Sequence, residues 1–125
     1  MYEKNKKKYF KKKNLFYKPW GKYINLFKGK EFLIKELSVK SKSKLSLQKH
    51  HYRAEYWLVT KGKPKITLNN KCFIMDINES IFIPIGSVHR IENPFKRTVK
   101  IIEAQLGSVL KETDIVRYKD DYGRA

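Results

Sequence analysis

Residues 48–62 read QKHHYRAEYWLVTKG, and residues 84–93 read PIGSVHRIEN. The aromatic and β-branched residues of both stretches favour strands. Four polar side chains in them are candidate metal ligands, namely Gln48, His50, Glu55 and His89. Two imidazoles, a carboxylate and an amide suit Zn²⁺, Fe²⁺, Mn²⁺ or Co²⁺, with coordination positions left for a substrate.

Strand parity refines this set, because successive side chains of a strand point to opposite faces. Gln48 and His50 share one face, whereas His51 falls on the other and is expected to be structural. Arg53, Glu55 and Trp57 form a second set that can line the same pocket. Each residue also has an ordinary explanation: a lone histidine is usually on the surface, and Glu55 can simply pair with Arg53.

Strand-like segments recur at spacings of about ten residues, which is typical of an all-β sandwich or barrel. They cover residues 30–40, 55–60, 64–68, 71–77, 80–83, 88–91 and 98–105. Asn69-Asn70 suits a two-residue hairpin turn, since asparagine tolerates positive φ. Pro64 favours an edge position for its strand. No long helical period interrupts the series, so a parallel α/β sheet is not expected.

The two ends of the chain differ from the middle. Residues 1–17 are a basic N-terminal arm, expected to be disordered or loosely docked, with an amphipathic helix as the alternative. Residues 18–125 are expected to form one domain. Residues 111–125 are polar, with a weak helical pattern.

The net charge is +17, but 24 of the 29 basic residues are lysine. Sequence-specific DNA readers rely on arginine for base contacts, so nucleic acid is not expected as a partner. A basic field would instead help to capture an anionic substrate such as a sugar phosphate.

No apolar run approaches the roughly 20 residues of a membrane span, and the lysine-rich start lacks a signal-peptide core. With one cysteine, Cys72, the chain has no internal disulfide. A cytoplasmic location is therefore expected, with Cys72 buried or half-buried.

The spacing of the two stretches resembles the paired motifs of the cupin superfamily. Residues 50–62 follow H-x₄-E-x₆-G, and Gln48 stands where the first motif begins with histidine. Residues 78–93 follow N-x₅-P-x-G-x₂-H-x₃-N, where Asn78 replaces the usual glycine. The resemblance implies a cupin fold, a double-stranded β-helix or jelly-roll barrel.

Further matches resemble type II mannose-6-phosphate isomerases and extend over residues 18–124. They read KPWGxY from Lys18, SLQxHHxRxExW from Ser46, IExQxG from Ile102, DIVR from Asp114 and DDYGR from Asp120. In that family the domain usually ends a bifunctional mannose-1-phosphate guanylyltransferase/isomerase. The guanylyltransferase domain is absent here, so we expect a standalone isomerase that does not make GDP-mannose by itself.

The resemblance implies interconversion of mannose 6-phosphate and fructose 6-phosphate through a cis-enediol, with a divalent metal for which zinc is the first expectation. The family's metal set falls on Gln48, His50, Glu55 and His89, and its motif arginine on Arg53.

Glu103 is the expected catalytic base, because parity on the last strand points it inward together with Gln105. The alternative interpretation of Glu103 is a surface carboxylate that pairs with Lys100. Lys35 shares a face with apolar neighbours, so it either reaches the rim or binds an anion. Arg53, Lys35 and Arg124 are the candidates for binding phosphate or stabilising the enediolate.

Gln105, Trp57 and Arg124 are the candidate substrate-binding residues, although Arg124 lies in a tail that can equally be solvated. A non-catalytic sugar-binding cupin and another cupin isomerase, epimerase or dioxygenase remain alternatives. Gln48 and Arg53 favour the isomerase over the dioxygenase. We also expect a homodimer, since small barrels cover exposed sheet edges by pairing.

Overall fold

The computed structural model describes residues 14–120, which form twelve β-strands and no α-helix. The strands are β1 (Leu15–Lys18), β2 (Gly21–Lys28), β3 (Phe32–Val39), β4 (Ser43–Lys44), β5 (Leu47–Lys49), β6 (Ala54–Lys61), β7 (Lys65–Leu68), β8 (Lys71–Ile74), β9 (Ser80–Ile83), β10 (His89–Asn93), β11 (Val99–Leu106) and β12 (Val116–Lys119). The predicted all-β class is confirmed.

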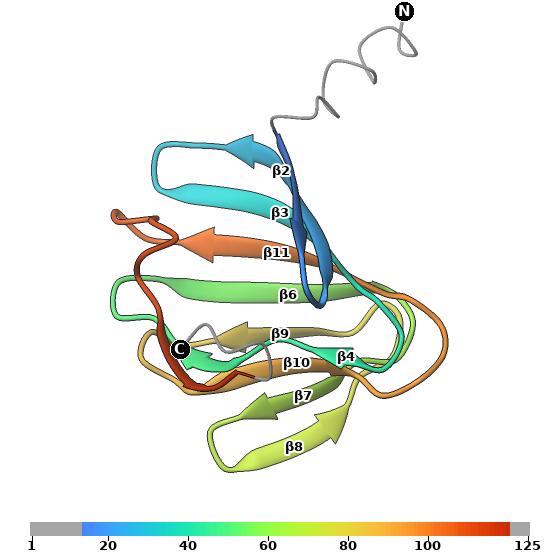
Figure 1. Cartoon of the computed structure of the whole chain (residues 1–125). Helices are drawn as coiled ribbons and strands as arrows, with labels where there is room; N and C mark the ends of the chain where they lie inside the picture. Colours follow the sequence, from blue (N-terminus) through green and yellow to red (C-terminus); the bar gives the residue numbers. More distant parts are fainter. Residues whose placement is uncertain (1–13, 121–125) are drawn as a thin grey trace, which may run out of the picture.

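The strands form two antiparallel sheets (Figure 1). The first has the order β1-β2-β3-β11-β6-β9, and the second has the order β12-β5-β10-β7-β8, with β4 paired to β10. After β11 the chain leaves the first sheet and crosses to the second, where β12 pairs with β5. This crossing brings the C-terminal segment against the residues around His50.

The interior between the sheets changes character along the strands. The inward side chains of β11 are apolar at Val99 and Ile101 and become polar at Glu103 and Gln105. The same strands therefore supply a hydrophobic core at one end and a set of buried polar groups at the other. The apolar end consists of Trp20, Tyr23, Leu37, Val39, Trp57, Val59, Ile66, Met75, Ile83, Ile91, Val99 and Ile101.

The strand predictions for residues 30–105 are confirmed, with boundaries shifted by a few residues. The hairpin is also confirmed, since Leu68 pairs with Lys71 and Asn69 has a φ of 53°. The predicted segments missed β2 and the short strands β4 and β5. Residues 1–13 of the predicted arm lie outside the described part of the chain. Leu15–Lys18, at the end of that arm, forms β1 and pairs with β2.

Three predictions are wrong. Pro64 does not mark an edge, because it precedes β7, which lies between β10 and β8. Cys72 is exposed, since it lies on the edge strand β8. The segment from residue 111 contains the strand β12 rather than a helix, because pairing with β5 satisfies its backbone. Within residues 14–120 no helix has the length and apolarity needed to cross a membrane.

Ile101 and Ile102 test the assignment of the two faces of β11. Ile101 is fully buried, whereas Ile102 is half-buried on the outer face. We expect Ile101→Ala to lower the free energy of unfolding by about 2–5 kcal/mol, because it leaves a cavity in the core. Ile102→Ala should cost no more than about 1 kcal/mol. Equal shifts of the urea midpoint in the two variants would contradict this placement.

Candidate metal centre and its cavity

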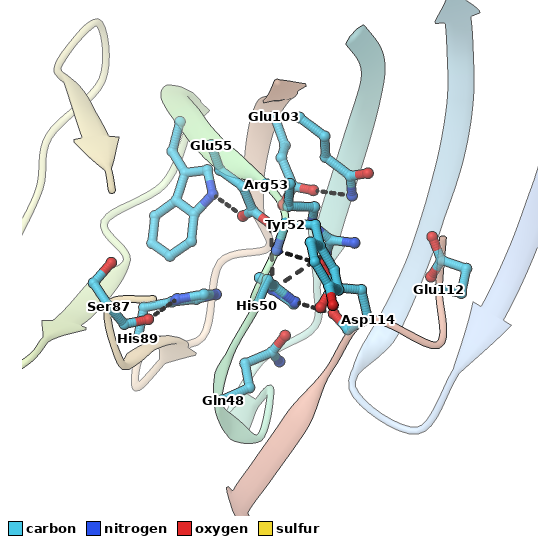
Figure 2. A network of polar contacts seen from close by, with 12 residues as sticks. Gln48, His50, Tyr52, Arg53, Glu55, Ser87, His89, Glu103, Glu112 and Asp114 are labelled. Carbon is cyan, nitrogen blue, oxygen red and sulfur yellow. Dashed lines mark hydrogen bonds and ion pairs between the residues drawn. The ribbon is translucent and has the colours of Figure 1, made fainter. Parts of the chain in front are cut away.

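Three predicted ligands converge on one point. His50 follows β5, Glu55 lies on β6 and His89 begins β10, and one ligand atom from each lies within 4.8 Å of the others (Figure 2). All three are buried, with 2%, 2% and 4% of their surface exposed. Two imidazoles and a carboxylate at this spacing are able to hold a divalent metal.

Backbone carbonyls orient both imidazoles. His50 Nδ1 lies 2.6 Å from the carbonyl oxygen of Asp114, and His89 Nδ1 lies 3.1 Å from that of Ser87. A carbonyl oxygen can only accept, so each Nδ1 carries the proton. Each Nε2 therefore keeps a lone pair, which is the arrangement that metal-binding histidines adopt.

The charge states also suit a metal. Burial lowers the pKa of His50 to about 4, and it lowers the pKa of His89 as well. Burial alone would raise the pKa of Glu55, but His89, Arg53, His50 and a hydrogen bond from Trp57 bring it down to about 2. At neutral pH the three ligands are two neutral imidazoles and one carboxylate, and each can donate a lone pair.

Gln48 lies beside this triad. Its backbone is paired with that of His89, and its side chain lines the same cavity. The amide Nε2 donates to the carbonyl oxygen and the Oγ of Ser46, at 3.3 and 3.0 Å. These bonds leave Oε1 as the atom that the amide can offer to a cation. Its role as a fourth ligand stays a prediction.

Arg53 and Trp57 hold the carboxylate of Glu55 in place. Arg53 Nε donates to Glu55 Oε2 at 2.9 Å, and Trp57 Nε1 donates to Oε1 at 2.8 Å. A second nitrogen of Arg53 lies 3.2 Å from His50 Nε2. The guanidinium therefore contacts two of the lone pairs that a metal would take, so the two cations compete for them.

Glu103 and Gln105 point into the interior, as parity predicted, and Glu103 is only 6% exposed. The alternative of a surface carboxylate paired with Lys100 is therefore wrong. Gln105 Nε2 donates to Glu103 Oε2 at 2.8 Å. Burial, followed by the negative charge of Glu55, raises the pKa of Glu103 to about 7.

Lys35 is also turned inward and is 3% exposed. Its Nζ lies 2.8 Å from Glu112 Oε2 and stands over the ring of Tyr23, 4.1 Å from the ring centroid. Burial and the charge of Glu112 raise the pKa of Tyr23 to about 12, so its phenol stays protonated. The inward direction of Lys35 is confirmed, and its partner comes from the C-terminal segment.

Asp114 is a residue that the spacing arguments missed. Besides its carbonyl bond to His50, its carboxylate accepts from the backbone nitrogens of His51 and Tyr52, at 2.8 and 3.0 Å (Figure 2). Asp114 thus joins the C-terminal segment to the turn that carries His50. The only sequence signal was its place in the DIVR motif. Arg124 lies outside the described residues.

These groups line a single cavity between the sheets. Three of the four candidate ligands, Gln48, Glu55 and His89, line this cavity, and His50 does not. Arg53, Trp57, Glu103 and Gln105 also belong to its walls. The remaining wall residues are Lys18, Trp20, Tyr23, Lys35, Leu37, Leu45, Arg90, Ile91, Glu112, Ile115 and Arg117. The cavity therefore combines two members of the candidate metal triad, Glu55 and His89, with a carboxyl group of near-neutral pKa and several cations.

Two adjacent histidines test the triad. We expect His50→Ala to lose the metal, because it removes a buried ligand, whereas His51→Ala should keep it, because that side chain is exposed. Metal per chain after dialysis is the measurement, with circular dichroism to show that both variants fold. A His50→Ala protein that kept one equivalent of metal would contradict the assignment.

Comparison with known proteins agrees with this geometry. The family described as Mannose-6-phosphate isomerase C-terminal matches residues 4–120. The alginate biosynthesis protein AlgA of Pseudomonas aeruginosa is 48% identical over 108 residues, and the mannose-1-phosphate guanylyltransferase ManC of Salmonella typhimurium is 44% identical over 108. Each match covers 86% of this chain and 22% of the relative, so the chain spans less than a quarter of these relatives.

Solved structures share the fold at low identity. The capsular polysaccharide assembling protein CapF of Staphylococcus aureus aligns with a TM-score of 0.73 at 19% identity, over 84% of this chain and 32% of CapF. The cupin domain of Cnp3 from Schizosaccharomyces pombe aligns with a TM-score of 0.66 at 20% identity, over 69% of this chain and 64% of that one. The fold is thus a cupin fold, as predicted, and the chain belongs to the family of mannose-6-phosphate isomerase C-terminal domains.

Proposed function

We propose that this chain is a metal-dependent mannose-6-phosphate isomerase, which interconverts mannose 6-phosphate and fructose 6-phosphate. The observation that supports the proposal is that the candidate metal triad borders, through Glu55 and His89, a cavity that also holds a buried carboxyl group with a pKa of about 7. An aldose–ketose isomerisation needs both an electrophile for the carbonyl oxygen and a base for the neighbouring carbon.

The proposed metal ligands are His50, Glu55 and His89, with Gln48 as the fourth. This mixed nitrogen and oxygen set suits Zn²⁺, and also Co²⁺, Mn²⁺ or Fe²⁺. When bound, the metal supplies a Lewis acid that polarises the carbonyl oxygen of the open-chain sugar.

Glu103 is the proposed base. Its carboxylate would take the proton from C2 of mannose 6-phosphate, which leaves an enediolate. Transfer of the hydroxyl proton from O2 to O1, and return of the first proton from Glu103 to C1, would then yield the ketose. A pKa of about 7 suits a general base at neutral pH, because a large fraction of the carboxyl groups is then ionised and the carboxylate is more basic than an ordinary one. The bond from Gln105 Nε2 to Glu103 Oε2 leaves Oε1 as the atom free to move the proton.

The remaining predicted residues have supporting roles in this proposal. Arg53 would stabilise negative charge on the enediol oxygens, a role supported by the contacts of its guanidinium with Glu55 and His50. Gln105 Oε1 would accept from a sugar hydroxyl. Trp57 acts on substrate through Glu55, since it is 1% exposed and donates to that carboxylate. Substrate binding by Arg124 stays a prediction.

A non-catalytic sugar-binding domain is the alternative that the same cavity would allow. It would bind the sugar phosphate without turnover, whereas the near-neutral pKa of Glu103 favours a catalyst. Homodimerisation and a cytoplasmic location stay predictions.

Removal and return of the metal separate these functions. The protein treated with EDTA should convert no mannose 6-phosphate in an assay coupled to fructose 6-phosphate, because the carbonyl then lacks its electrophile. Zn²⁺, Co²⁺ or Mn²⁺ should restore turnover. An absence of turnover with every metal, in protein shown to contain one equivalent, would sink the isomerase proposal.

Glu103→Gln tests the base. We expect kcat to fall by about 10²–10⁴, because the amide cannot take a proton. Glu36→Gln is the matched control, since Glu36 lies on the neighbouring strand β3 and is only half-buried. Glu103 must be ionised to accept a proton. The activity of the wild type should therefore fall as the pH drops through the pKa of Glu103, which is about 7. A kcat unchanged by Glu103→Gln would assign the base elsewhere.

A further inference from the structure

Three buried polar atoms of the described residues have no hydrogen-bond partner, and two of them line the cavity. They are the acceptor Gln105 Oε1 and the donor Arg117 Nε. A buried polar group without a partner is costly, so such atoms often mark the place of a ligand. The first atom calls for a hydrogen-bond donor, and the second calls for an acceptor.

The other cations of the cavity wall already have partners or are exposed. Lys35 pairs with Glu112, and Arg53 pairs with Glu55. Arg90 donates to the backbone oxygens of Leu45 and Lys119, at 2.8 and 3.2 Å, and so ties strands together. Lys18 is exposed at the edge of the first sheet.

Arg117 differs from these cations. Among the described residues it has neither an ion pair nor a hydrogen bond from its side chain, and its Nε is buried. It lies on β12 directly opposite Gln48 of β5. Opposed residues of an antiparallel pair project to the same face, so Arg117 stands next to a proposed metal ligand.

We propose that Arg117 binds the phosphoryl group of the substrate, an inference that rests on the proposed function. A guanidinium presents a planar fork of donors that matches phosphate oxygens, and a dianion would satisfy the buried Nε. This differs from the sequence expectation, which placed phosphate on Arg53, Lys35 or Arg124. Within the described part of the chain, the first two already have carboxylate partners.

The proposal also orients the substrate. Arg117 belongs to the second sheet, whereas Glu103 and Gln105 belong to β11 of the first. A sugar phosphate would span the cavity between the sheets, with its phosphoryl group at β12 and its reacting carbons at Glu103. Selection for a phosphorylated sugar would then come from a strand that lies outside both cupin motifs.

Arg117→Met tests this site in the metal-loaded protein. We expect the dissociation constant for mannose 6-phosphate, measured by calorimetry, to rise roughly 30-fold or more, as for loss of one partner of a buried charge pair. Catalytic efficiency toward mannose 6-phosphate should fall to a similar degree. Arg97→Met is the control, since it removes the same charge at an exposed position outside the cavity.

Arg117→Gln keeps polarity and serves where Arg117→Met does not fold, as judged by its melting curve. Unchanged affinity for mannose 6-phosphate in either folded variant would overturn the phosphoryl site, even if the wild type is an active isomerase. A wild type that binds mannose 6-phosphate through Arg117 without converting it would keep the site and sink the isomerase. Failure of the wild type to bind the sugar phosphate would overturn both.

Discussion

The ionised carboxylate of Glu55 is the constraint on which the rest of the site depends. It is 2% exposed, and burial of an isolated charge is prohibitive unless donors replace the lost water. The positively charged Arg53 donates a hydrogen bond to one carboxylate oxygen, and Trp57 donates a hydrogen bond to the other. Because both donors come from the same strand and turn as Glu55, the carboxylate is held in a defined direction before any ligand arrives.

The same carboxylate couples the two halves of the proposed chemistry. Its charge, added to burial, raises the pKa of Glu103, which lies on the adjacent strand β11. A metal bound to Glu55 would reduce that charge and lower the pKa of Glu103. In the proposed mechanism, metal binding and the basicity of Glu103 would therefore be linked through one buried group.

Strand parity explains which site residues could be predicted. The period of two is local, so Lys35, Glu103 and Gln105 could be placed inside from their own strands, and they do lie there. Predictions about which strands lie side by side failed, because strand pairing is not a local property. Whether Pro64 lies at an edge, or Cys72 is covered, depends on strands that are distant in sequence, and a strand's own residues do not name its partners.

The sequence by itself determined the all-β class, the faces of the strands and three candidate metal ligands, because alternation and motif spacing are properties of neighbouring residues. Only the tertiary structure decided what holds and completes the site. Asp114 contacts His50, and Arg117 lines the cavity, because the chain crosses between the sheets after β11 and pairs β12 with β5. That contact joins segments more than sixty residues apart, and no local pattern specifies it.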